Sequence, residues 1–433
     1  MASRVLVMDS GGAEVRVGWA SDKAPRSAVA AGPGGAGGRR STATDDFPPP
    51  FLPLSPPFFA HRHVPNYALK PKGNKRTYIG PEISEVRDFS QVHYRRPVEK
   101  GYVVHWPLQR DVWTRALGDE GQGDDDVILV ATEQPFTLPA VRAARDETVF
   151  ERMGVGALAT LACGAAVARA ATEADGEWVG AKSGAVLVLD SGYSFTHAVP
   201  VLHGQVLHDA VRRIDLGGKA LTNYLKEIVS YREWNMMDET HVMNTVKERL
   251  CYCSTDFLAD LKASAKTRRL FREFVLPDYH TNVTGYVKGE QEPPEGVTEQ
   301  VLRMNNERIT VPEALFHPSD IGLNQAGIAE AVHLAVQATP EELHPAFYSA
   351  IVTAGGNSRL PGFREKLAQE LRPFVPSHMD MDIRAPDDPV SLAWLGAAAY
   401  ARDDAWLARS RVTRAEYEEL GAHALQARRE TMR

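Results

Sequence analysis

Two aspartates stand where a chain can hold a phosphate and a metal ion. Asp9 and Asp190 each begin an Asp-Ser-Gly turn, and each turn lies between two apolar runs, as expected for a β-hairpin. Turn amides bind phosphate oxygens, glycine permits a close backbone approach, and a carboxylate behind the turn holds water around a divalent cation. Two such hairpins predict a site that grips one polyphosphate from opposite sides.

A third glycine-rich turn supports this interpretation. Gly355 and Gly356 follow an apolar run at residues 351–354 and precede a predicted helix, an order that brings backbone amides to a ligand. One glycine-rich turn usually serves only as a turn, whereas three in order are more specific. The chain has no GxxxxGK[ST] motif, so a P-loop is not expected.

The composition is that of a folded protein with more than one core. The chain has 433 residues, 43% hydrophobic and 24% charged, and ~150 residues per domain predicts two or three units. A net charge of -7 argues against a surface built for naked nucleic acid. The three cysteines are too few for a disulfide framework or a four-cysteine zinc site, so we expect small buried residues in a reducing compartment: Cys163, Cys251 and Cys253.

Strands and helices alternate through the middle of the chain, which predicts an α/β architecture. Residues 155–168 are alanine-rich and shorter than the ~20 residues that span a bilayer, so we expect a buried helix there. Residues 31–60 are rich in glycine and proline, which predicts a flexible insertion, with regular structure resuming near Tyr78. Other expected elements are a strand at 126–133 and helices at 107–117, 139–153, 216–229, 239–261, 324–338 and 361–371.

Several motifs resemble those of actin and the actin-related proteins, and the resemblance covers most of the chain. They include VLVMDSGG at residues 5–12, RRPVEKGYVVHW at 95–106, LVLDSGYSFTHAVP at 187–200 and IVTAGGNSRLPGF at 351–363. Within the family, DSGYSFTHAVP, the run at 217–232 and TRAEYEELG at 413–421 are most similar to the nuclear class of actin-related protein 6.

The resemblance implies an actin-like ATPase fold of the ribonuclease H-like type, with two lobes around a nucleotide cleft. The outer lobe is expected at residues 1–153 plus 392–433, with a disordered Gly/Pro-rich insertion at about 31–75, and the inner lobe at 154–391. It also implies ATP or ADP with Mg²⁺, which Asp9 and Asp190 would hold through water. The nucleotide-binding residues carried over by position are Asp9, Gly11, Gly12, Arg16, Asp190, Ser191, Gly192, Ser194, Gly218, Lys247, Glu248, Gly355, Gly356 and Asn357.

Departures from the family pattern begin at the nucleoside. A family arginine there is Asn244 in this chain, a tyrosine against the base is Leu360, and a lysine over the base is Val390. These replacements remove a cation, an aromatic ring and a second cation that would bind a nucleoside. They predict weaker binding of the base.

The positions implied to be catalytic also differ. Tyr193 replaces a second-turn aspartate that helps to hold the water around the cation, and Glu147 stands at the position matched to the catalytic glutamine. A carboxylate ~4 Å from a γ-phosphate would add about 4 kcal/mol of repulsion at an effective dielectric near 20. His197 matches the histidine beside the hydrolytic water, although a lone histidine on a strand is more often structural. We therefore expect slow or absent hydrolysis and no catalytic residues.

The family class implies a function in the nucleus, with the cytoplasm as a second compartment. It implies a non-catalytic subunit of a SWR-type chromatin-remodelling complex, which deposits the Z-type variant of histone two-A, in transcription regulation. The implied partners are zinc-finger HIT-type and histone-binding subunits, with histones contacted indirectly, and neither a membrane nor sequence-specific nucleic acid. Arg95 and Arg96 are expected to be solvated. An active actin-like ATPase and a filament-forming protein remain alternatives, although the Gly/Pro-rich insertion argues against a filament.

Overall fold

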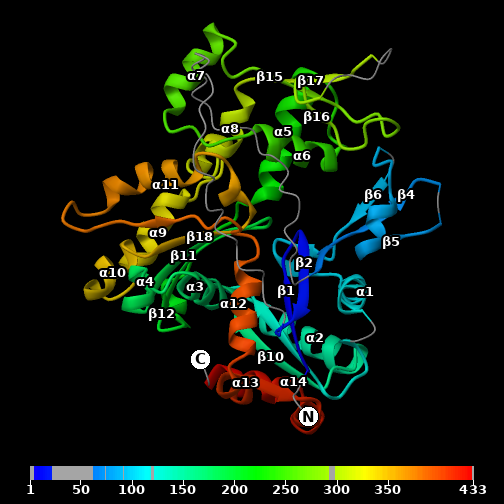
Figure 1. Cartoon of the computed structure of the whole chain (residues 1–433), viewed down its shortest axis with the longest axis vertical. Helices are drawn as coiled ribbons and strands as arrows, with labels where there is room; N and C mark the ends of the chain where they lie inside the picture. The colour runs from blue at the N-terminus through cyan, green and yellow to red at the C-terminus, as the bar shows by residue number, and fades with distance from the viewer. Residues whose placement is uncertain are drawn as a thin grey trace, which may run out of the picture.

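The computed structural model describes residues 4–21, 62–73, 75–90, 92–118, 121–291 and 298–431. Two six-stranded sheets form its centre, with helices between and around them (Figure 1). The alternation of strands and helices confirms the predicted α/β architecture. The insertion predicted at residues 31–60 lies outside the described residues. Within the described ranges, no helix combines the length and the hydropathy needed to cross a bilayer.

The first sheet contains the first predicted hairpin. β1 (Arg4–Ser10) pairs antiparallel with β2 (Glu14–Trp19) and parallel with β9 (Val127–Glu133). Successive β1 residues such as Leu6 and Val7 are both buried, because helices cover both faces of the sheet. The strand order is β20-β10-β9-β1-β2-β3, completed by β10 (Ala157–Ala162), β20 (Arg411–Thr413) and β3 (Arg62–Pro65).

The second sheet repeats the pattern of a hairpin beside a parallel strand. β11 (Ala185–Ser191) pairs antiparallel with β12 (Thr196–Leu202) and parallel with β18 (Ile351–Ala354). The predicted hairpin around Asp190 is thus confirmed. The sheet is completed by β13 (Gln205–Val206), β14 (Arg212–Ile214) and β19 (Ile383–Arg384).

Two helices of small residues lie between the sheets (Figure 1). α3 (Cys163–Ala174) and α12 (Leu392–Ala401) pack so closely that a methyl group on Gly396 would collide with the Ala166 carbonyl. Trp394 is fully buried and donates its indole N–H to the Val7 carbonyl at 3.1 Å. Small side chains therefore let α12 approach the first sheet and α3 together.

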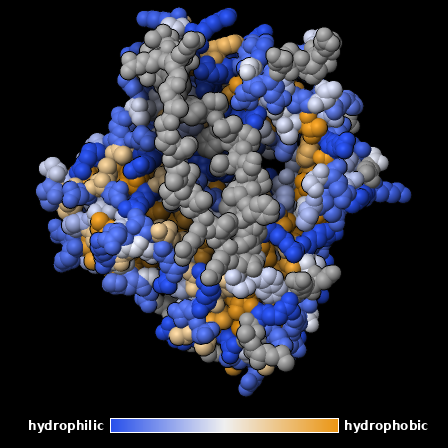
Figure 2. All heavy atoms as spheres, in the orientation of Figure 1, coloured by the Kyte–Doolittle hydropathy of each residue, from blue (hydrophilic) through white to orange (hydrophobic). Residues whose placement is uncertain are grey.

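The remaining helices and short strands flank these sheets. Around the first sheet lie α1 (Trp106–Leu117), α2 (Pro139–Glu147), α13 (Asp404–Ser410), α14 (Arg414–Thr431), β4 (Ala68–Pro71), β5 (Tyr78–Ile79), β6 (Val92–Arg95), β7 (Val98–Glu99) and β8 (Tyr102–Val103). On the other side are α4 (Val179–Ser183), α5 (Gly218–Arg232), α6 (Thr240–Leu250), α7 (Phe257–Lys266), α8 (Glu307–Glu313), α9 (Ile328–Gln337), α10 (His344–Tyr348), α11 (Phe363–Leu371), β15 (Arg272–Val275), β16 (Tyr286–Val287) and β17 (Val301–Met304). Most described residues on the face in Figure 2 are hydrophilic, as the charged content predicts.

Three expectations about secondary structure are wrong. Residues 155–168 are not one helix: β10 occupies their centre and α3 begins at Cys163, because parallel pairing with β9 outweighs the helix propensity of alanine. Regular structure is already present at Arg62, well before Tyr78, since β3 pairs with β2 and β4 pairs with β6, within the part of 31–75 expected to be disordered. The helix expected at 239–261 ends at Leu250, and a new one starts at Phe257 with Asp256 as its N-cap.

The predicted lobe boundary at residue 153 precedes β10. This strand nevertheless pairs with β9 in the first sheet. The chain passes from the first sheet into the helices between the sheets at Cys163, where β10 gives way to α3.

Candidate functional site

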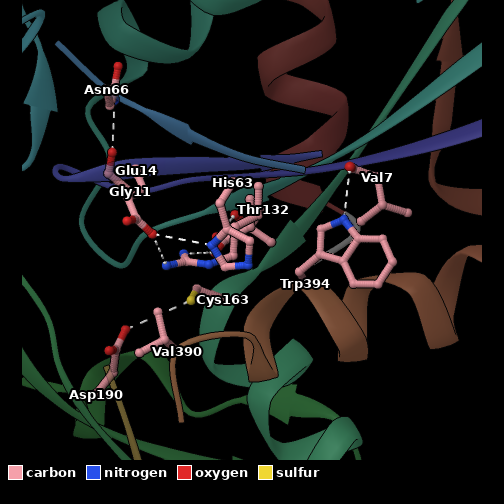
Figure 3. A network of polar contacts seen from close by, with 12 residues as sticks. Val7, Gly11, Glu14, His63, Asn66, Thr132, Cys163, Asp190, Val390 and Trp394 are labelled. Carbon is pink, nitrogen blue, oxygen red and sulfur yellow. Dashed lines mark hydrogen bonds and ion pairs between the residues drawn. The ribbon is translucent and has the colours of Figure 1, made fainter. Parts of the chain in front are cut away.

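The first Asp-Ser-Gly turn is held by a buried asparagine. Gly11 donates its amide to the Glu14 carbonyl at 2.9 Å, which closes the turn between β1 and β2. Asn66 is fully buried, donates its side-chain amide to the Gly11 carbonyl at 2.8 Å and its backbone amide to Ala13 at 2.8 Å. Figure 3 shows the contact between Asn66 and Gly11. The turn therefore has a fixed shape without a ligand.

Asp9 lies behind this turn with its carboxylate already bonded. Thr132 on β9 donates its hydroxyl to Asp9 Oδ1 at 2.7 Å, and Arg16 on β2 lies 3.2 Å from Oδ2. Both Asp9 and Arg16 are buried, and Arg16 also pairs with Glu14 at 2.9 Å. The positive charge expected to face a phosphate is thus shared by two carboxylates.

The second turn is tied to the third. Gly192 donates its amide to the Phe195 carbonyl at 2.9 Å and so closes the turn between β11 and β12. Asn357 donates to Ser191 Oγ at 3.1 Å and to the Gly192 carbonyl at 2.9 Å. A methyl group on Gly355, where φ is +84°, would collide with the Ser191 carbonyl, so only glycine fits this approach.

The two hairpin turns meet each other directly. A methyl group on Gly12 would collide with Ser194 Oγ, and one on Gly101, just before β8, would collide with the Phe195 ring. We call the meeting point of residues 10–13 and 191–195 the hairpin junction. The structure brings these predicted site residues to it: Asp9, Gly11, Gly12, Arg16, Asp190, Ser191, Gly192, Ser194 and Gly355.

Asp190 carries the most perturbed carboxylate at the hairpin junction. Desolvation, and then the charge of Asp9, raise its pKa to about 6. The thiol of Cys163 is a polar partner of this carboxylate, with Sγ 3.9 Å from Oδ2 (Figure 3). Burial and the same two aspartates raise the pKa of Cys163 well above its usual value, so the thiol stays protonated.

The assignment of Glu147 to a catalytic position is wrong. Its side chain is 51% exposed at the end of α2, lies 3.6 Å from Arg152, and belongs to a helix that packs on α14. The helix that enters the hairpin junction is α3, and its first residue there is Cys163. A thiol does not repel a phosphate as a carboxylate would, so the repulsion expected from Glu147 is absent from the described junction.

His197 lies directly opposite Asp190 in the ladder of β11 and β12, so both side chains are on one face of the sheet. Its ring is buried against Phe136 and Phe195, with centroids 6.3 and 5.7 Å away. Desolvation, with a further effect of Arg213, lowers its pKa to about 4, so the imidazole is neutral near pH 7. Its Nε2 atom has no hydrogen-bond partner among the residues that the structure describes.

The predicted nucleoside residues bind one another. Lys247 is buried and donates to the Gly218 carbonyl at 3.1 Å, Thr222 at 2.9 Å and Asn244 at 3.0 Å. These three acceptors use all three N–H bonds of its ammonium group. Asn357 also lies here, because a methyl group on Gly218 would stand 3.1 Å from its side-chain oxygen. Lys247 therefore serves the protein's own helices.

The other predicted nucleoside residues are spread around this group. Glu248 is exposed and accepts a hydrogen bond from Asn244 at 2.7 Å, and a methyl group on Gly356 would meet no atom of the described part of the chain within 4 Å. Leu360 is buried in the hydrophobic core beside the second sheet, and Val390 is half-buried. Neither apolar side chain offers a polar contact to a base.

Arg96 is the main residue that sequence reasoning missed. It was expected to be solvated, and that expectation is wrong. Its guanidinium lies 4.8 Å from the ring centre of Tyr67 and 4.6 Å from that of Tyr193, whereas Arg95 is exposed as predicted. The RRPVEKGYVVHW motif could have drawn attention to Arg96. Nothing in the order of residues, however, indicates that two distant tyrosines lie beside this arginine.

The sequence profile of the actin family matches residues 2–430. The chain belongs to the actin family. It is 38% identical over 421 residues to the actin-like protein arp6 of Aspergillus fumigatus, covering 87% of this chain and 89% of that one. It is 37% identical to actin-related protein 6 of Arabidopsis thaliana, covering 83% and 91%, and 36% identical to that of Drosophila melanogaster, covering 84% and 93%. The actin-like fold and the resemblance to the actin-related protein 6 class are therefore confirmed.

The family's magnesium nucleotide fits only part of this actin-family site. Asp9 and Asp190 are close enough for the charge of one to raise the pKa of the other, and a divalent cation relieves such repulsion. On the nucleoside side, the donors of Lys247 are already used and Leu360 and Val390 are apolar. The residues thus fit a cation with phosphate better than they fit a nucleoside.

Proposed function

We propose that this actin-related protein is a non-catalytic subunit of a SWR-type ATP-dependent chromatin-remodelling complex in the nucleus. The complex deposits the Z-type variant of histone two-A, and the chain is its structural and interaction module. One observation carries the non-catalytic part: Tyr193 takes the place of a cation-binding aspartate, and its ring stacks on Arg96. The complex itself is proposed because the chain is similar over most of its length to actin-related protein 6 of several organisms.

The proposed partners follow from the same class. They are zinc-finger HIT-type and histone-binding subunits of the complex, with histones contacted through them. We propose no direct contact with a membrane or with specific DNA sequences, and no filament. ATP or ADP with Mg²⁺ is proposed as a structural ligand, which would stabilise the folded chain by mass action. Asp9 and Asp190 would hold the metal through water.

A catalytic function is the competing proposal. The pair of Asp9 and Asp190 favours it, since two interacting carboxylates suit a divalent cation. Two residues argue against a catalytic function. Tyr193 has no carboxylate to bind a cation, and Cys163, which lies beside Asp190, has a thiol and neither a carboxylate nor an amide. An ATPase on this site would need its base and its water held by other groups.

Affinity purification of the tagged chain from nuclear extract tests the proposal. The co-purifying proteins are identified by mass spectrometry, and nucleotide is released by acid and quantified. We expect the subunits of a remodelling complex, with any nucleotide that co-purifies, trace or stoichiometric, not turned over. A solitary protein with rapid ATP hydrolysis would support the competing proposal, and a pellet that grows with concentration in ATP would indicate a filament.

A further inference from the structure

Arg96 joins three segments at the hairpin junction. Its guanidinium lies between the rings of Tyr67 and Tyr193, at 4.8 and 4.6 Å from their centres, and its Nη1 donates to the Gly12 carbonyl at 3.4 Å. We call the first six-stranded sheet and the elements around it the first half of the structure, and the second sheet with its elements the second half. Tyr67 and Gly12 belong to the first half, whereas Tyr193 belongs to the β11–β12 turn of the second. Arg96 therefore contacts both halves.

The surroundings favour this stack. A guanidinium is planar and weakly hydrated, so it stacks on aromatic faces, and the attraction grows when water is excluded. Arg96 is half-buried, and desolvation raises the pKa of both Tyr67 and Tyr193, so both phenols stay neutral. The rings therefore keep the negative faces that attract the cation.

A second contact lies beside the first. The Phe195 ring fits against Gly101, where a methyl group would collide with it. Arg213 lies 3.6 Å from the centre of the same ring and donates to the Tyr102 hydroxyl at 2.7 Å. Both aromatic residues of the second turn thus hold the first half, one on each side of Ser194.

We propose that Arg96 acts as a built-in cation that clamps the two hairpin turns together, so that the junction stays closed without nucleotide or divalent cation. Tyr193, which costs the site a metal-binding carboxylate, supplies the ring that makes this clamp. This clamp rests on the proposed structural role of the chain. It would let the chain offer partners the same surface with and without nucleotide. Co-purification tests the role, and the isolated chain tests the clamp, so the two can fail separately.

Hydrogen exchange of the purified full-length chain tests the clamp. Exchange is followed by mass spectrometry in peptides covering residues 10–14 and 191–196, in Mg²⁺-ATP and after removal of nucleotide and metal with apyrase and EDTA. For the wild type we expect less than a twofold change in these peptides. For Arg96→Ala we expect exchange at least about tenfold faster without ligand, since the aromatic contacts of Arg96 and its hydrogen bonds to Gly12 and Tyr193 are lost.

Matched variants separate the clamp from general damage. Arg95→Ala removes a neighbouring exposed charge and should behave as the wild type. Tyr193→Phe keeps the ring but loses the hydroxyl that is hydrogen-bonded to Arg96, so its exchange should lie closer to that of the wild type than to that of Tyr193→Leu. Tyr193→Leu leaves Arg96 intact, removes the ring and should reproduce Arg96→Ala, which keeps the test usable if Arg96→Ala does not fold. Rapid exchange of both turns in the ligand-free wild type, or equal exchange in Arg96→Ala and Arg95→Ala, would overturn the proposal.

Discussion

Asp190 and His197 are directly paired across β11 and β12, and their pKa values are shifted in opposite directions. The pKa of Asp190 rises from 3.8 to about 6, and that of His197 falls from 6.5 to about 4. Burial causes both shifts, because it disfavours the charged form of each group. The pair is therefore neutral in the folded chain at about pH 5.

The pair predicts two opposite dependences of stability on pH. The folded pKa of Asp190 is raised, so its contribution is present below pH 3.8 and is lost as pH rises through about 6. The folded pKa of His197 is lowered, so its contribution is present above pH 6.5 and is lost as pH falls through about 4. In the wild type these two effects largely cancel between pH 4 and pH 6.5.

Replacing one partner should expose the other's effect. As pH rises from 4 to 6.5, we expect the free energy of unfolding of Asp190→Asn to increase by on the order of 2 kcal/mol relative to that of the wild type, because only the effect of His197 remains. Over the same rise in pH, the free energy of unfolding of His197→Phe should decrease by a similar amount. Urea unfolding at pH 4, 5, 6 and 7 measures both slopes, and parallel curves for the two variants would contradict the assignment.

Glu147→Ala should have little effect on the chain. Its carboxylate is exposed and lies 3.6 Å from an exposed Arg152, and such surface pairs contribute ~0–1 kcal/mol. Any ATP turnover by the purified protein should be unchanged in this variant. Thermal unfolding and a phosphate-release assay measure both expectations. A loss of turnover in Glu147→Ala with an intact fold would restore the catalytic assignment.

Gly101→Ala should destabilise the hairpin junction more than its backbone conformation explains. Gly101 has a φ of +72°, where alanine costs ~1 kcal/mol, and the added methyl group collides with Phe195, which adds ~1–3 kcal/mol. Gly123→Ala is a matched control, because Gly123 has a φ of +65° and no atom of the described residues lies within 4 Å of the added methyl group. Equal midpoints for the two variants in chemical unfolding would show that the Phe195 contact is not tight.

Lys247→Met should cost stability and not only ligand binding. Removal of the ammonium takes a donor from three acceptors, and the Thr222 hydroxyl can still donate to only one of the other two, Gly218 or Asn244, so we expect a cost of ~2–3 kcal/mol. Lys219→Met, at an exposed position on the same side of the structure, is the control. If the unfolding free energy of Lys247→Met matched this control while released nucleotide fell, the lysine would serve a nucleotide.

Local chemistry made the hairpins predictable. Both Asp-Ser-Gly turns lie between apolar strands in the sequence, and both form antiparallel pairs in the structure. The strand at residues 157–162 was not predictable, because its alanine-rich sequence favours a helix and only pairing with β9 makes it a strand. The assignment of Glu147 failed for a related reason. A position matched along the sequence does not show which side chain lies beside Asp190, and in the structure that side chain is Cys163.

The sequence by itself determined the family, the α/β architecture and the two turns, since these depend on the local pattern of residue types and on motifs that resemble those of the actin family. Only the tertiary structure decided what surrounds the turns. It set Arg96 between Tyr67 and Tyr193, gave all three donors of Lys247 to the protein and placed His197 opposite Asp190. These contacts join residues from separate elements, and their strength depends on the exclusion of water, which chain order does not specify.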